Sequence, residues 1–78
     1  MDLPPAEALS EARRLIRTLD SAPNPQQQAQ SAMATLMRCS SWPPASQRKI
    51  LDLAAWLATR PAPKTLKARC QALLNGLG

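Results

Sequence analysis

The sequence predicts an all-α fold, namely a small antiparallel four-helix bundle with up-down-up-down topology. Three observations lead to this prediction. Pro25, Pro44 and Pro63 stand nineteen residues apart, and Pro5 precedes the first of them by twenty residues. Each of these prolines opens a run of about fifteen residues in which apolar side chains recur at helical spacing. The 78 residues include no valine and only two isoleucines, so the composition gives β-strands little support.

The four prolines mark where helices begin. Proline suits the first helical position because no N–H is needed there and the ring holds φ near its helical value. We therefore expect helices over residues 5–19, 25–39, 44–59 and 63–75 in a single domain, residues 1–78. The intervening segments of three to five residues have the length that joins antiparallel neighbours in helical bundles.

Residues 5–19 carry an apolar stripe on one face and charged side chains on the other. The stripe consists of Ala8, Leu9, Ala12, Leu15, Ile16 and Leu19. Glu7 suits the positive start of this helix and Arg17 suits its negative end.

Residues 25–39 have the clearest start signal, because Asn24 can cap the helix and Gln27 stands where a capping box places its partner. The stripe on this segment is soft, and it consists of Ala29, Ala32, Met33, Leu36 and Met37. We expect this helix to be the weakest of the four. Met33 and Met37 suit a surface that accepts a partner's helix, although methionine is more often core filler. The glutamines at 26, 27, 28 and 30 predict a solvated face.

Residues 44–59 have the widest apolar coverage. The central stripe consists of Ile50, Leu53, Ala54 and Leu57, and it is widened by Leu51, Ala55 and Ala58. Such a helix needs neighbours on more than one side, so we expect it at the centre of the bundle.

Residues 63–75 form the last predicted helix, because Ala62 precedes a proline and is disfavoured in the α region. The stripe consists of Leu66, Cys70, Leu73, Leu74 and Leu77. Asn75 and Gly76 predict the end of this helix. Cys39 and Cys70 have no histidine or CxxC motif beside them, so two reduced thiols are favoured over a disulfide between helices.

The residue inventory argues against an enzyme. The chain has no histidine, no tyrosine, no glycine-rich loop, and no serine or cysteine with an available base. We expect no catalytic, cofactor-binding or metal-binding residue. No leader pattern and no long apolar stretch are found, so we expect a cytoplasmic protein that does not use a membrane.

Basic residues gather near the predicted starts of the last two helices, in a chain of net charge +5. Arg48 and Lys49 lie near the first of these starts, and Arg60, Lys64, Lys67 and Arg69 surround the second. A helix start is itself positive, so these cations cost a little stability while building, with the free N–H groups, a site for phosphates or carboxylates. The simpler alternative is that these basic residues only keep a small apolar protein in solution.

Two tryptophans lie off the main apolar stripes. Trp56 falls with Lys49 and Asp52 on the helical wheel, and Arg60 is placed one turn later to stack over the indole. Tryptophan is typical of binding hot spots, but a neighbouring helix that covers Trp56 would make it core. Trp42, in the segment before Pro44, either caps the core or forms a second anchor.

These observations favour a noncatalytic helical interaction protein, an adaptor, inhibitor, regulator or chaperone-like partner of a larger assembly, with a homodimer as one form. The residues expected to bind a protein with an acidic or apolar surface are Trp42, Trp56, Arg60, Lys64, Lys67 and Arg69. The alternative is a nucleic-acid-binding module whose phosphate contacts would be Arg48, Lys49, Arg60, Lys64, Lys67 and Arg69. A recognition element for nucleic acid is not evident, which makes this the second choice.

Overall fold

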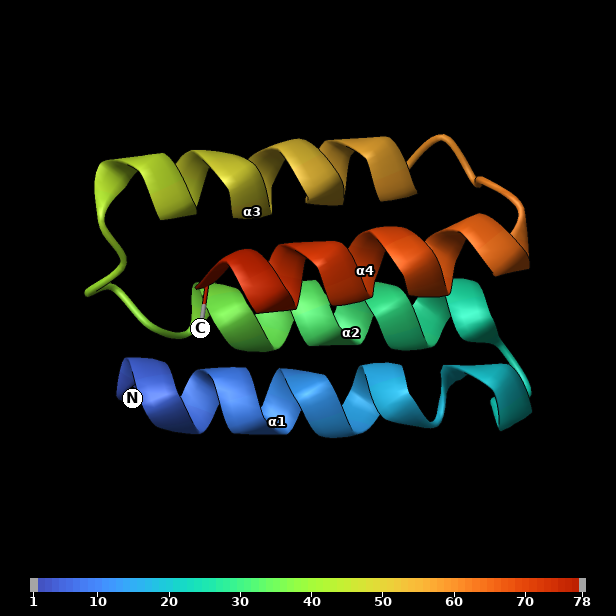
Figure 1. Ribbon diagram of the computed structural model, residues 1–78, viewed down its shortest axis with the longest axis horizontal. Coiled ribbons are helices and arrows are strands. Elements are labelled where there is room, and N and C mark those ends of the chain that lie inside the picture. The colour runs from blue at the N-terminus through green and yellow to red at the C-terminus, as the bar shows by residue number, and fades with distance from the viewer. Residues whose placement is uncertain (1, 78) are drawn as a thin grey trace.

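The computed structural model describes residues 2–77 and contains a bundle of four helices. The helices are α1 (Pro5–Arg17), α2 (Pro25–Met37), α3 (Pro44–Leu57) and α4 (Pro63–Leu77), with a 3₁₀ turn, η1 (Leu19–Ser21), after α1. Successive helices run in opposite directions, which confirms the all-α, up-down-up-down prediction (Figure 1). None of the described helices is long and apolar enough to span a lipid bilayer.

The helix starts coincide with the four prolines, whereas the ends depart from prediction. The first three helices end two residues earlier than expected. After α1 the Thr18 hydroxyl bonds back to the Arg14 and Leu15 carbonyls, and after α3 the residue Arg60 takes a left-handed conformation with φ of 57°. The last helix instead runs through Asn75 and Gly76 to Leu77, whose side chain packs against the core. The predicted stop at Asn75 and Gly76 is therefore wrong.

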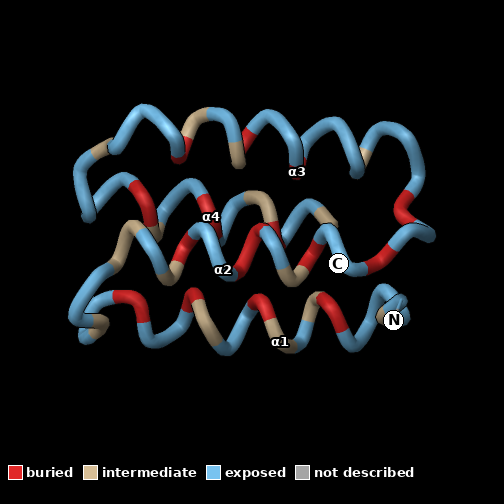
Figure 2. Tube along the Cα trace, turned by 180° about the vertical axis from the view of Figure 1, so that it is seen from behind, coloured by how far each residue is buried: buried red, intermediate tan, exposed pale blue. Residues whose placement is uncertain are grey.

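The middle of the bundle is occupied by α2 and α4. Each of them contacts the other three helices, whereas α1 and α3 make no contact with each other among the described residues (Figure 1). The expectation that the helix at 44–59 is central is therefore wrong. Because α3 packs on α2 and α4 from one side only, the residues that widen its stripe, Leu51, Ala55 and Ala58, are left exposed (Figure 2).

Two glutamines tie the start of α2 to the ends of its neighbours. The Gln26 side-chain N–H donates to the Leu57 carbonyl at the end of α3. The Gln28 side-chain N–H donates to the Leu15 carbonyl at 2.6 Å and to the Thr18 hydroxyl at 2.8 Å. Both glutamines thus add a donor to carbonyls in the last turns of α1 and α3, where carbonyls lack the full set of helical partners. The predicted solvated glutamine face is therefore wrong for Gln26 and Gln28, which are half-buried.

The core is apolar throughout, with no buried charged or polar residue among those described. Every helix turns its buried residues inward (Figure 2). The seven largest fully buried side chains are Ile16, Leu19, Leu36, Ile50, Leu57, Leu66 and Cys70. At one end of the bundle, the Leu3 N–H donates to the Arg38 carbonyl and the Ser40 N–H donates to the Asp2 carboxylate. The chain start is thereby fastened to the segment after α2.

Replacing Asn24 tests the cap of α2. The Asn24 side-chain oxygen accepts a hydrogen bond from the Gln27 N–H at 3.1 Å. Asn24→Ala should lower the free energy of unfolding in urea by about 1 kcal/mol, because one N–H at the helix start loses its partner. Asn24→Asp keeps an acceptor and serves as the control. An alanine variant as stable as wild type would show that the cap contributes nothing.

The buried thiol of Cys70 predicts a loss of stability in alkali. Neither Cys39 nor Cys70 forms a disulfide, and burial raises the pKa of the Cys70 thiol from 9.0 to about 11. Above pH 9.0 the unfolded chain loses this proton while the folded chain keeps it up to about pH 11. The free energy of unfolding should therefore fall by about 1.4 kcal/mol per pH unit in this window, and Cys70 makes no such contribution below it.

Urea titrations at pH 8 to 11 measure this slope. The slope is compared with that of Cys70→Ala, which should be shallower because this thiol is absent. Equal slopes for wild type and Cys70→Ala would contradict the prediction.

Candidate functional site

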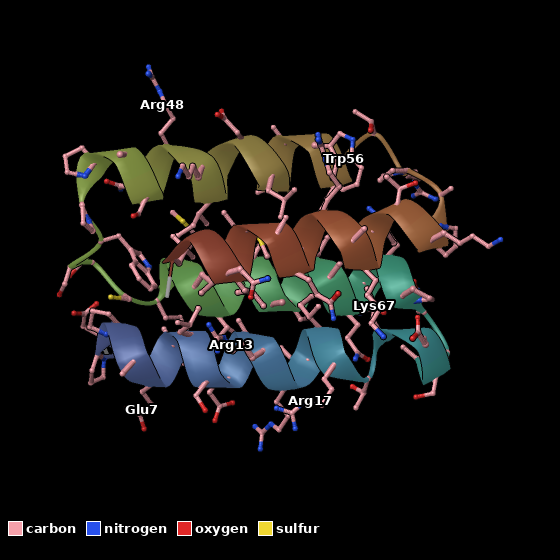
Figure 3. All side chains as sticks on the ribbon, in the orientation of Figure 1. Glu7, Arg13, Arg17, Arg48, Trp56 and Lys67 are labelled. Atoms are coloured by element: carbon pink, nitrogen blue, oxygen red, sulfur yellow. The ribbon has the colours of Figure 1, made fainter. Side chains whose placement is uncertain are left out.

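The cations expected to contact phosphates do not assemble into one patch. Arg48 and Lys49 belong to the start of α3, and Lys64 and Lys67 belong to the start of α4. These starts lie at opposite ends of the bundle (Figure 1), and Arg48 points away from the other helices (Figure 3). A nucleic-acid backbone is bound by several cations along one surface, and Arg48 and Lys49 do not join the cations around the start of α4 in such a surface.

Two of the predicted cations already have partners within the chain. Lys67 forms an ion pair with Asp20, which joins α4 to η1. Arg69 lies over the Trp56 ring, with its guanidinium carbon 4.7 Å from the ring centroid. The predicted stacking of Arg60 on Trp56 is therefore wrong, since the stacking cation comes from the neighbouring helix α4. Trp56 is half-buried, and Arg69 of α4 covers part of its ring.

Trp42 belongs to the core. Its side chain is buried, and the indole N–H donates to the Leu36 carbonyl at 2.7 Å. Of the two roles expected for Trp42, the structure confirms core capping. Its indole is not presented to a partner.

The most distinctive surface runs along the border of α2 and α3. We call it the α2/α3 face and define it by Gln30, Ala34, Met37, Leu51, Ala54, Ala55 and Ala58. A hollow of about 250 Å³ opens between the two helices, with Met33 and Leu57 at its floor and Met37 and Ala54 on its walls. Leu51 and Ala58 stand one turn to either side of Ala54, so they continue the same surface along α3.

Large apolar side chains are exposed on this face. Met37 is 41% exposed and Leu51 is 49% exposed, and no other large apolar side chain of residues 2–77 is classed as exposed. Met33, in contrast, is only 2% exposed. Each of the two roles expected for the methionine pair therefore applies to one residue, because Met33 fills the core and Met37 lies on the surface.

The α2/α3 face also carries no charge. The thirteen residues of α2 include no acidic or basic side chain, and none of the α3 residues that define the face is charged. Burial accounts for the absence of charge where α2 faces its neighbours. It does not account for the absence of charge at the exposed positions of the helix, which are Gln27, Gln30, Ser31 and Ala34. Charged residues are depleted at the centres of protein interfaces, and methionine is enriched there.

Sequence reasoning placed the partner-binding residues elsewhere, around the start of α4. The available signal was the absence of charge from residues 25–37, in a chain where 19% of residues are charged. The helical wheel placed Leu51, Ala55 and Ala58 beside the central apolar stripe of this helix, but it could not show that no other helix would bury them.

No group of three or more histidine, cysteine, aspartate or glutamate residues lies together in the described part of the chain in a way that could hold a metal ion. The chain matches no protein-family model, and comparisons with curated proteins and with solved structures give no significant match. Any assignment of function therefore depends on the chemistry of the surfaces.

The role of Trp42 can be checked by removing its hydrogen bond. Trp42→Phe should lower the free energy of unfolding by about 1–2 kcal/mol, because the N–H bond to Leu36 is lost and a smaller ring fills the site. Trp56→Phe is the matched comparison, and it should cost less because Trp56 is half-buried and has no hydrogen bond at its indole. Equal losses in urea unfolding would contradict the core assignment of Trp42.

Proposed function

We propose that the protein is a noncatalytic helical interaction protein that docks an apolar helix of a partner protein on the α2/α3 face. The observation that carries this proposal is the charge-free surface on which Met37 and Leu51 are both exposed. Large exposed apolar patches on soluble domains mark binding surfaces. Noncatalytic action and a cytoplasmic location remain predictions from the sequence.

The shape of the face suits a helix. The residues at 34, 54, 55 and 58 are alanines, whose small side chains allow a partner backbone to approach closely. The larger side chains of Met37 and Leu51 project further from the surface. Methionine adapts to the side chains it meets because its chain is unbranched and flexible. A helix laid in a groove with apolar anchors one turn apart is a recurrent mode of recognition.

The chemistry of the face disfavours the other classes of partner. Nucleic acids bind through cations, and this face has none. Membrane-surface helices combine an apolar face with basic residues, whereas the exposed polar residues of α2 are glutamines and a serine. The bundle measures 30 × 21 × 20 Å between Cα positions, and a stable interface buries about 800 Å² on each side. A partner must therefore cover most of this side of the molecule.

The test uses two glutamate substitutions on the face. Met37→Glu with Leu51→Glu should weaken binding of the partner, once purified from the native host, by about 100-fold or more, because two unpaired charges would be buried. Both residues are exposed, so helicity by circular dichroism should be unchanged. Ala68→Glu with Ala72→Glu is the matched control, since both alanines are exposed on α4 and the change in charge is equal.

Methyl resonances of methionine locate the contact independently. The Met37 methyl signal should shift when the purified partner is added, while the buried Met33 signal should move little. Equal binding by the Met37→Glu, Leu51→Glu variant and by wild type would overturn the proposal. Sedimentation measures whether the protein is a dimer. If it is, and if the two glutamate substitutions dissociate it, the face binds a second copy of this chain, and the proposal of a different partner protein is wrong.

A further inference from the structure

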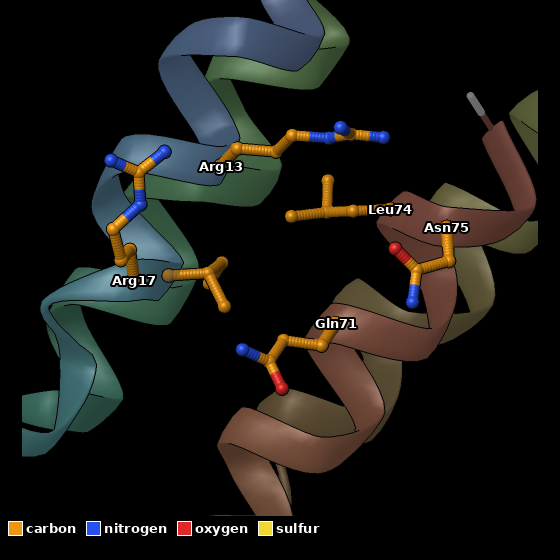
Figure 4. A pocket seen from close by; sticks show the side chains of 6 residues that line it. Arg13, Arg17, Gln71, Leu74 and Asn75 are labelled. Carbon is orange, nitrogen blue, oxygen red and sulfur yellow. The ribbon is translucent and has the colours of Figure 1, made fainter.

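A trough along α1 lies on the opposite side of the bundle from the α2/α3 face. Its first part is a hollow of about 340 Å³ between α1 and α4, lined by Arg13, Ile16, Arg17, Gln71, Leu74 and Asn75 (Figure 4). A second hollow of about 360 Å³ adjoins it on α1 and is lined by Ala6, Leu9, Ser10 and the same two arginines. Arg13 and Arg17 thus stand where the two hollows meet.

Arg13 and Gln71 reach from opposite helices into the space between α1 and α4 (Figure 4). Arg13 extends over Leu74 toward α4, and the Gln71 carboxamide points from α4 toward α1 (Figure 4). Arg17 stands on the outer rim one turn after Arg13. The trough therefore has one guanidinium group, that of Arg13, over the hollow, a second, that of Arg17, at its outer rim, and two carboxamides on the α4 side.

Along the border of α1 and α4, the charged side chains that the structure describes are paired at one end and unpaired at the other. At the end near η1, the chain's own Asp20 carboxylate pairs with Lys67 of α4. One and two turns further along α4, Gln71 and Asn75 replace the lysine, and the hollow contains no acidic side chain. The two ion pairs found among the described residues are this one and Arg14 with Glu11, so neither Arg13 nor Arg17 is neutralised there.

This arrangement costs the isolated protein some stability. Two like charges four residues apart on a helix repel each other by a few tenths of a kcal/mol. An external anion offsets that repulsion, and guanidinium groups bind carboxylates through paired N–H donors. One helical turn separates the two arginines, which is the spacing of two acidic residues at positions i and i+4 of a partner helix.

We infer that this trough, which we call the α1/α4 groove, binds an acidic amphipathic helix of a partner protein. Carboxylates of the occupant pair with Arg13 and Arg17, and its apolar side chains lie on Leu9 and Ala6 beside them. The net charge of +5 attracts such a segment before contact is made.

A protein segment suits the groove better than a nucleic acid. Duplex binding needs a line of several cations, but Lys67 is paired with Asp20, and Arg48 and Lys49 belong to α3, which does not touch α1. The inference is independent of the α2/α3 face, because the two surfaces lie on opposite borders of the bundle and share no residue. Both can be occupied together, which would make the protein a bridge between two partners.

The test uses blocked helical peptides of about 16 residues and the full chain labelled with ¹⁵N. The acidic peptide has glutamates at i and i+4 on one face and leucines beside them, and the matched peptide has glutamine at each glutamate. The acidic peptide should shift the side-chain N–H signals of Arg13, Arg17, Gln71 and Asn75 and should bind about tenfold more tightly than the glutamine peptide. Its binding should weaken as salt is raised.

Arg13→Gln with Arg17→Gln should reduce binding of the acidic peptide by about tenfold, because two charge-assisted contacts are removed. Both arginines are exposed, so the fold should be retained, which circular dichroism checks. Arg48→Gln with Lys49→Gln removes the same charge from α3 and should leave binding unchanged.

Three results would overturn the inference. They are the absence of shifts at the α1/α4 groove, equal binding by the Arg13→Gln, Arg17→Gln variant and wild type, and equal loss in the α3 control. A 12-base-pair DNA duplex that shifts the groove signals where the acidic peptide does not would assign the groove to nucleic acid. Loss of peptide binding with the α2/α3 face still functional would leave the proposed function standing.

Discussion

The bundle depends on the packing of α2, a helix without a single charged side chain that contacts all three other helices. An ionised group on its inner faces would have to leave water without a partner, which is costly, so small and flexible apolar side chains fill those faces. Gln26 and Gln28 add a second constraint, because their carboxamides reach the carbonyl ends of α3 and α1. These hydrogen bonds join the start of α2 to the ends of α3 and α1, while apolar packing holds the three helices together.

The central position of α2 and α4 separates α1 from α3 and leaves each outer helix with an uncovered side. On α3 this side is apolar and merges with the uncharged surface of α2. On α1 it carries Arg13, which reaches toward the carboxamides of α4, and Arg17 at the outer rim. Two borders of one small bundle therefore differ sharply in chemistry. The two surfaces share no residue, so the proposals made for them are independent of each other.

Two of the cations that the sequence offered for binding are engaged by contacts within the chain. Arg69 of α4 lies over the Trp56 ring, and Lys67 forms an ion pair with Asp20. Both cations looked available from the sequence, because their partners are far away along the chain. An ion pair between residues 47 positions apart is invisible to local pattern reading. Such contacts redirect the search for a binding surface from the start of α4 to surfaces where neither charge nor apolar area is matched.

The sequence by itself determined the helical class, the four starts and the cap at Asn24. All of these depend on interactions within one helical turn: the ring of proline, the missing N–H, and a side chain that reaches three residues ahead. Tertiary structure decided where α4 ends, since Gly76 stays helical and Leu77 packs on the core. It also decided that Met33 is core and Met37 surface, that Trp42 is buried, and that α3 lies at the side. A helical wheel gives the width of an apolar stripe, but the burial of each residue depends on how many neighbouring helices cover it.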